Sequence, residues 1–125
     1  MRLGRRRAGF PHGLGRVPRR VVVRGGSMVP TLHDGDVVLA VPGLRPRDGA
    51  VALVRWPARP DQLSVKRLAL RFPDDDDAAD DAAAHWFAVG DAPTASTDSR
   101  TLGPAVALAV VTHRLWPRPG RLPRR

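Results

Sequence analysis

Short apolar stretches separated by turn-forming residues constrain the fold of this chain more than any other feature. Val, Leu and Ala dominate the stretches, and Gly, Pro and Asp stand between them. Runs of this length and composition favour strands, and turn signals at this spacing are typical of small all-β folds. We therefore expect a mostly β fold, arranged as a small coiled β-barrel or sandwich. The six expected strands cover residues 21–24, 36–41, 50–56, 62–70, 85–89 and 105–116.

The net charge of +9 lies at the ends of the 125-residue chain. Residues 1–20 carry seven Arg and residues 117–125 carry four, with no acid in either segment. Both segments are rich in Arg, Pro and Gly, so we expect flexible basic tails around one folded domain, residues 21–116. Nucleic-acid binding is not favoured, because a nucleic-acid-binding domain presents its charge on a folded face. An anionic membrane surface or an acidic partner stays an alternative for the tails.

Composition also limits the chemistry. The chain has no cysteine, which excludes disulfides, thiolate metal sites and a cysteine nucleophile. Residues 73–84 (PDDDDAADDAAA) hold six of the twelve acids and are expected to form an exposed loop. Consecutive Asp residues lack the spaced ligands of a calcium loop, so we expect no metal and no cofactor. The longest run without Asp, Lys, Arg or His is 101–112, too short to cross a bilayer, so we expect a soluble, cytoplasmic protein without a membrane anchor.

Ser27 is the first candidate for chemistry. It follows Gly25 and Gly26, which let the backbone turn sharply after a strand, and Met28 and Pro30 follow it. The segment is not the G-x-S-x-G nucleophile elbow. Taken alone, it is also compatible with an ordinary Gly-Gly-Ser turn.

Lys66 is the second candidate, because it is the one lysine beside twenty arginines. Arginine does not lose its proton at usable pH, whereas a buried lysine can act as a base. On a strand, Lys66 shares a face with Leu68 and Leu70, apolar neighbours that disfavour its charged form. A surface lysine is the alternative.

The segment 90–103 is a small polar loop bounded by glycines. In it, Ser96 is within reach of a lysine in principle, and Asp98 and Arg100 are candidates for an ion pair that fixes the loop. Histidine is the usual base for a serine nucleophile. His33 and His113 stay open as alternatives to Lys66, whereas His12 and His85 lie in the tail and beside the acidic run.

Together and in order, four segments resemble the motifs of the type I signal peptidase family of serine–lysine proteases. They are Ser-Met-x-Pro-Thr-Leu (27–32), Gly-Asp with an apolar strand (35–41), Val-Lys-Arg (65–67) and Gly-Asp…Ser-x-Asp-Ser-Arg…Gly (90–103). The resemblance covers about residues 21–104. It implies a β-rich catalytic core of the signal peptidase type, with Ser27 as nucleophile and neutral Lys66 as general base. It further implies that Ser96 orients the lysine and that Asp98 and Arg100 support the site.

The chain also departs from that family. The membrane anchor of signal peptidases is not expected here, and Ala92 stands where the family usually has Asn after Gly-Asp. Position 25 is Gly where some members have an oxyanion-binding serine, so backbone N–H groups, including that of Ser27, are expected to hold the oxyanion.

A short, cysteine-free member ending in Leu-Trp-Pro-Arg-Pro (115–119) is similar to the maturation proteases of nickel-type superoxide dismutase. That resemblance implies removal of an N-terminal leader from the dismutase proenzyme. The resemblance to signal peptidases, which prefer small residues just before the cut, implies the same preference here. Three alternatives remain: a signal-peptidase-like protease for another precursor, a self-cleaving repressor protease with the same dyad, and a non-catalytic binding module. The repressor needs an N-terminal DNA-binding domain, for which residues 1–20 are too short.

Overall fold

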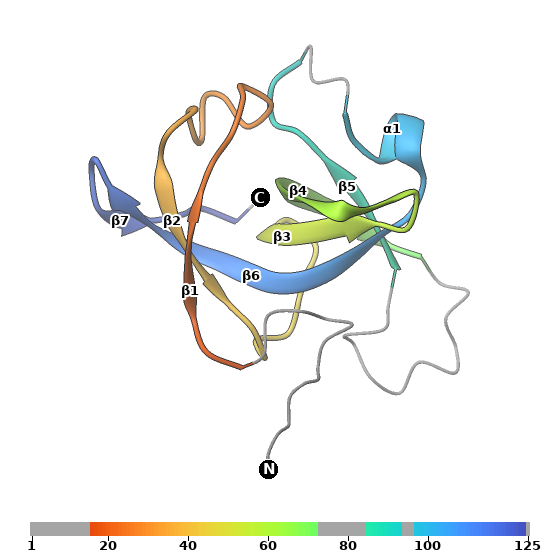
Figure 1. The fold of residues 1–125 in the computed structure, drawn as a ribbon, viewed down its shortest axis with the longest axis horizontal. Coiled ribbons are helices and arrows are strands. Elements are labelled where there is room, and N and C mark those ends of the chain that lie inside the picture. The colour runs from red at the N-terminus through yellow and green to blue at the C-terminus, as the bar shows by residue number, and fades with distance from the viewer. Residues whose placement is uncertain (1–15, 73–84, 94–96, 125) are drawn as a thin grey trace.

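One antiparallel sheet and a short helix make up the described part of the chain. The computed structural model describes residues 16–72, 85–93 and 97–124. The elements, shown in Figure 1, are β1 (Arg19–Val22), β2 (Val37–Val41), β3 (Val51–Trp56), β4 (Arg59–Arg71), β5 (His85–Val89), α1 (Ser99–Leu102), β6 (Ala105–Trp116) and β7 (Gly120–Arg121). The expectation of a mostly β fold is confirmed.

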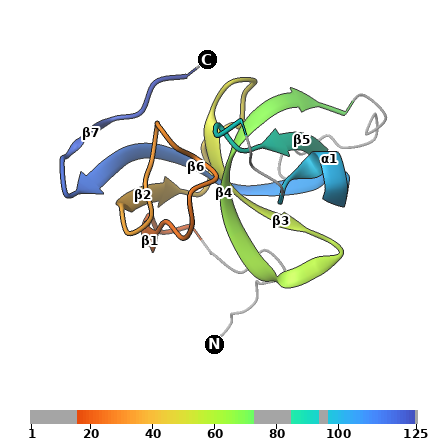
Figure 2. The same ribbon diagram turned by 90° about the horizontal axis from the view of Figure 1, so that it is seen from above.

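Strand β6 organises the sheet. The strand order is β1-β2-β6-β3-β4-β5, and β5 also pairs with β6, so that β3, β4, β5 and β6 close a ring. The first residues of β6 pair with β5, while its second half pairs with β2 and then with β7. Strands β1, β2 and β7 therefore extend from one end of the ring, as Figures 1 and 2 show.

Strand β3 is buried on both faces and separates two hydrophobic clusters. Val51 and Leu53 belong to the first cluster, whereas Ala52, Val54 and Trp56 belong to the second. Successive strand residues point to opposite faces, so a continuous apolar stretch is what a strand between two cores requires. The stretch 50–54 meets this requirement and places β3 between the two clusters, next to β4.

Most strand bounds agree with expectation. The predicted bounds of β5 and β6 are confirmed, whereas β4 is longer than predicted at both ends and β1 begins at Arg19, inside the expected N-terminal tail. The sequence predicted neither α1 nor β7. Among the described residues, no helix is long and apolar enough to span a membrane. Residues 1–15 and the acidic run 73–84 lie outside the described residues.

The expectation that residues 117–125 form a flexible tail is wrong for residues 117–124. Gly120 and Arg121 pair with β6, and the N–H of Leu122 donates to the carbonyl of Thr112 at 2.9 Å. The half-buried Leu122 side chain packs against the first hydrophobic cluster. The carbonyl of Pro123 accepts a hydrogen bond from the Arg67 guanidinium at 2.9 Å. The high Arg and Pro content is typical of a flexible tail, and for this reason neither β7 nor the packing of Leu122 was predicted.

Ending the chain after Trp116 tests this packing. We expect the free energy of unfolding to fall by about 2–4 kcal/mol, since several hydrogen bonds and the contact of Leu122 are lost. Urea unfolding followed by tryptophan fluorescence measures it. Arg118→Ala, an exposed change in the same segment, serves as the control and should stay within about 0.5 kcal/mol of the intact chain. A truncated chain as stable as the intact one would show that the segment contributes nothing.

Candidate active site

The loop after β1 presents Ser27. Gly25 has φ of +79°, a left-handed conformation that favours glycine, and its N–H donates to Asp34 Oδ1 at 2.7 Å. Met28 and Leu32 are buried in the first cluster, and the N–H of Leu32 donates to the carbonyl of Met28 at 2.9 Å. One turn stabilised by glycine and two apolar anchors therefore hold the serine at the surface of the core.

Gly26 and Pro30, the other two residues of this loop noted in the sequence, are less constrained by their surroundings. Gly26 does not have positive φ, and a Cβ built on it meets only the Val29 side chain, at 3.9 Å. The carbonyl of Gly26 accepts from the N–H of Val29 at 3.2 Å, which closes the turn. Pro30 is exposed. Of the two glycines, Gly25 is the one whose backbone conformation requires glycine.

Lys66 lies beside Ser27. It belongs to the buried stretch of β4, is 4% exposed, and pairs across the sheet with Ala52 of β3. Its Nζ lies 2.6 Å from Ser27 Oγ, within hydrogen-bond distance. Residues 39 positions apart in sequence thus meet in a serine–lysine pair.

Burial lowers the pKa of Lys66 below its ordinary value of 10.5, and the negative charge of Asp98 opposes this in part. The apolar neighbours differ from expectation. Leu68 is fully buried, but Leu70 is 49% exposed, because the pairing of β4 with β5 shifts between these two residues. The expected apolar surroundings are therefore correct for Leu68 and wrong for Leu70.

Asp98 and Arg100 form the ion pair suggested by the loop sequence. Arg100 Nη2 lies 2.7 Å from Asp98 Oδ2, and the Asp98 carboxylate, fully buried, caps α1 by accepting from the N–H of Arg100 at 3.0 Å. Burial by itself raises the pKa of Asp98, but hydrogen bonds from Arg100 and from the N–H of Gly90 outweigh it and hold the pKa below its ordinary value. Asp98 is thus a carboxylate whose negative charge is close enough to raise the pKa of Lys66.

A buried network around Arg67 was not identified from sequence. Its guanidinium holds Asp91 by two hydrogen bonds, of 3.1 and 2.6 Å, and donates to the carbonyl of Gly49 at 3.0 Å. The Thr31 hydroxyl donates to the same Asp91 carboxylate at 2.5 Å. Both charged residues lie in segments that matched the family motifs, Val-Lys-Arg and Gly-Asp, and this was the one available signal.

The network reaches Ser27 through the backbone. The N–H of Ala92, the residue after Asp91, donates to the carbonyl of Ser27 at 2.9 Å. A main-chain donor makes this contact, so the Ala in place of the family's Asn leaves it intact. Arg67 follows Lys66 in β4, so one ion pair sets the position of the serine loop relative to the lysine strand.

The remaining candidates stay outside the pair. Ser96 and His12 lie outside the described residues, so the proposed orientation of Lys66 by Ser96 is not described. His33 is exposed, and His113 Nδ1 contacts Thr112 Oγ1 at 2.9 Å. Lys66 is the side chain bonded to Ser27 Oγ among the described residues. Those residues also contain no group of three His, Asp or Glu that could hold a metal ion.

A groove of about 400 Å³ runs along Ser27 and Lys66. It is lined by the segment 21–27 and by residues 62–66 of β4, together with Leu53 and Thr97. Strand β1 pairs only with β2 in the described sheet, and β5 pairs with β4 only from Arg67 onward. The groove therefore lies between two strand edges whose backbone groups are available to an extended peptide.

Replacing Lys66 with Met tests the cost of its burial. Because the folded-state pKa lies below 10.5, the unfolded chain holds the lysine proton more tightly, and charging opposes folding. The penalty is greatest below the folded-state pKa and declines as pH rises toward 10.5. We expect Lys66→Met to melt at a higher temperature than the parent near pH 7, with a difference that narrows at alkaline pH. Lys66→Arg, which cannot shed its charge, should melt below both; Lys66→Met melting below the parent at every pH would contradict the account.

Comparison with known families supports a protease-like chain. Residues 20–77 match the family described as Peptidase S24-like, and the matched segment contains both Ser27 and Lys66. No curated protein and no solved structure matches the chain. Over that segment the chain is similar to the Peptidase S24-like family, and the similarity supports a serine-protease-like function at a coarse level.

Proposed function

We propose that this chain is a serine endopeptidase that removes a leader peptide from a precursor protein, with Ser27 as nucleophile and Lys66 as general base. The observation that carries the proposal is the 2.6 Å contact between Lys66 Nζ and Ser27 Oγ. A serine hydroxyl is a weak nucleophile until a base takes its proton. A lysine with a lowered pKa supplies that base when it is neutral.

The first half of the reaction forms an acyl-enzyme. Lys66 Nζ takes the proton of Ser27 Oγ as the oxygen attacks the scissile carbonyl carbon. The resulting oxyanion faces the N–H of Ser27, which has no acceptor among the described residues. The N–H of Gly25 is already bonded to Asp34, so it does not contribute. The Lys66 ammonium then protonates the leaving amine, the peptide bond breaks, and an ester on Ser27 remains.

Water completes the turnover. Neutral Lys66 takes a proton from a water molecule that attacks the ester, and it returns the proton to Ser27 Oγ as the acid product leaves. Asp98 counteracts part of the pKa depression of Lys66 from its buried position. Its own pairing with Arg100 keeps it ionised, so the loop and the charge near the lysine are fixed together.

The proposed substrate is the proenzyme of nickel-type superoxide dismutase. The support is the resemblance of the short, cysteine-free sequence and its Leu-Trp-Pro-Arg-Pro segment (115–119) to the maturation proteases of that enzyme. The groove between two strand edges suits an extended leader. The expectation of small residues before the cut rests on the resemblance to signal peptidases. We place the reaction in the cytoplasm.

Incubation with that proenzyme tests both the chemistry and the substrate. We expect leader removal by the parent and loss of at least about 10³-fold in rate for Ser27→Ala and Lys66→Arg, since neither variant can complete the proton transfer. The rate constant kcat/KM should rise with pH through the lowered pKa of Lys66, because the neutral amine is the active form. Mass spectrometry of the products locates the cut.

The variants separate the alternatives. Equal cleavage by all three proteins would identify a contaminant, and cleavage kept in Lys66→Arg would return the role of base to a histidine. If this proenzyme is not cleaved but another precursor is, the proposed substrate is wrong and the proposed serine–lysine dyad is retained. Fragments of the chain itself, formed by the parent and not by Ser27→Ala, would identify self-cleavage. Melting temperatures of the variants confirm that each is folded.

A further inference from the structure

The groove beside Ser27 is positively charged. Among the described residues that line it, the ionisable side chains are Arg24 and Lys66, and there is no carboxylate. Lys66 is buried and faces the serine hydroxyl, where the proposed function requires it to be neutral. Arg24 therefore carries the permanent charge of the groove.

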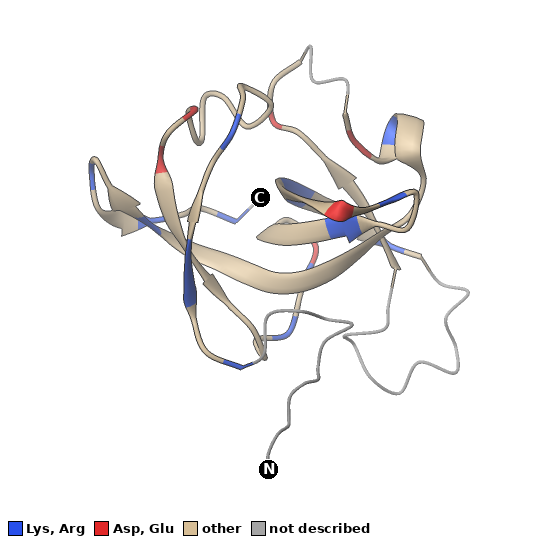
Figure 3. Cartoon of the chain, in the orientation of Figure 1, with Lys and Arg blue, Asp and Glu red and all other residues tan. Residues whose placement is uncertain are grey.

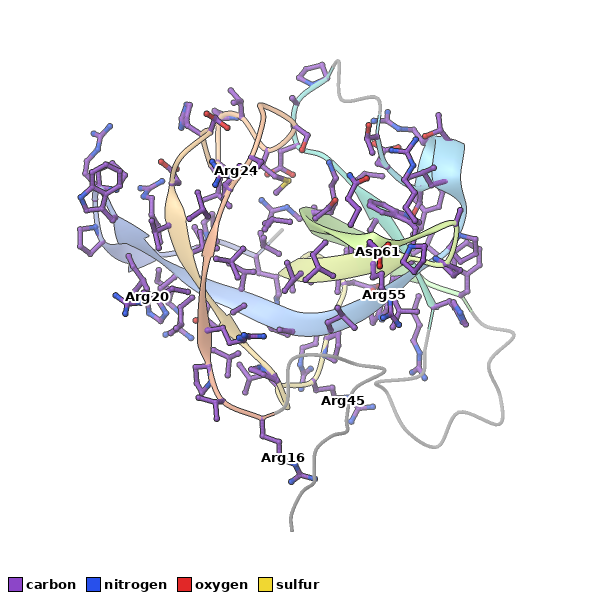
Figure 4. All side chains as sticks on the ribbon, in the orientation of Figure 1. Arg16, Arg20, Arg24, Arg45, Arg55 and Asp61 are labelled. Carbon is purple, nitrogen blue, oxygen red and sulfur yellow. The ribbon has the colours of Figure 1, made fainter. Side chains whose placement is uncertain are left out.

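Arg24 is well placed to meet a bound peptide. It follows β1, directly precedes Gly25 and is exposed, and Figure 4 shows it at the end of the strand that leads into the serine loop. Arg24 stands three residues before Ser27, and three residues span at most about 10 Å even when fully extended, so Arg24 lies within reach of about three residues of an extended peptide from the reacting serine. Its long side chain extends that reach.

The nearby carboxylates do not neutralise Arg24. Asp34 accepts from the N–H of Gly25 with Oδ1, and no carboxylate pairs with Arg24 in the part of the chain that the structure describes. Asp61 is exposed on the opposite wall strand, β4, and Figure 4 shows it apart from Arg24. Figure 3 shows that the acidic positions of the described residues lie mostly on loops. The guanidinium is thus available for a carboxylate from a ligand.

We propose that Arg24 is a specificity-determining residue that selects peptides with Asp or Glu within about three residues of the scissile bond. The inference rests on the proposed endopeptidase function, since it assumes that a peptide lies in the groove. An exposed guanidinium attracts a carboxylate and repels a Lys or Arg side chain at the same place. Because Arg24 is exposed, the selection is moderate and weakens as salt screens it.

Peptide binding to the Ser27→Ala protein tests Arg24 without cleavage. The probe is a fluorescent peptide that spans the cleavage site, with Asn, Asp or Lys placed in turn at each of about six positions around the scissile bond. We expect one or two positions at which Asp binds about two- to fivefold more tightly than Asn, and Lys more weakly, at low ionic strength. Anisotropy titrations give each Kd. The preference should largely disappear in about 0.5 M salt.

Charge reversal makes the test specific. Ser27→Ala/Arg24→Glu should bind the Lys peptide best at the same position, and the matched control Ser27→Ala/Arg20→Glu should keep the preference for Asp. Arg20 is also an exposed arginine, lies in β1 and does not line the groove. An unchanged order of peptides in the Arg24 variant, or no binding of any peptide, would overturn the proposal.

Cleavage of the Asn peptide by the parent protein tests the proposed function separately. Selective binding without cleavage would retain the role of Arg24 and contradict the endopeptidase. Cleavage without any preference for Asp would support the endopeptidase and contradict the role of Arg24.

Discussion

The guanidinium of Arg67, buried beneath the site, joins four parts of the chain that are far apart in sequence. It forms an ion pair with Asp91 of the loop after β5. Water is largely excluded from this pair, since both side chains are at most 5% exposed. It also bonds the carbonyls of Gly49, before β3, and Pro123, in the last segment. A buried ion pair contributes little net stability but fixes geometry, and removing one partner is costly. Here the fixed geometry is the distance between the serine loop and strand β4, on which the contact of Lys66 with Ser27 depends.

The same arrangement is what the proposed role of Lys66 as a base requires, in a chain whose other basic residues of this kind are all arginines. Strand β4 places Lys66 against Ser27 and the next residue, Arg67, against Asp91. The two adjacent basic residues therefore have different partners. The guanidinium of Arg67 donates two hydrogen bonds to Asp91, whereas burial lowers the pKa of Lys66 and the negative charge of Asp98 limits that shift. A guanidinium in the place of Lys66 would stay charged and could not accept the serine proton.

Local patterns were sufficient to predict most of the sheet, and they failed where distant segments decide the structure. The apolar stretch Val51–Val54 predicts a buried strand, and the turn residues around β2 mark where that strand begins and ends, so both strands lie where they were expected. The segment after Trp116 looks like a tail by composition, yet Leu122 and the acceptor at Pro123 have partners more than nine residues away along the chain. Leu70 seemed to share the face of Lys66 until an irregularity in the pairing with β5 turned it outward. The sequence resemblance identified Ser27 and Lys66 as a pair. The hydrogen bonds of Arg67 could not be predicted in the same way, because its partners lie in distant segments of the chain.

The most direct test of this account is the pKa of Lys66 itself. The chain has a single lysine, so ¹³C- and ¹⁵N-labelled lysine gives one side-chain signal whose titration needs no assignment. The account predicts a midpoint clearly below 10.5 in the folded protein and a return to the ordinary value when the same sample is unfolded in urea. A folded-state midpoint at 10.5 would mean that Lys66 stays charged at neutral pH, and it would contradict the proposed role of Lys66 as the base for Ser27.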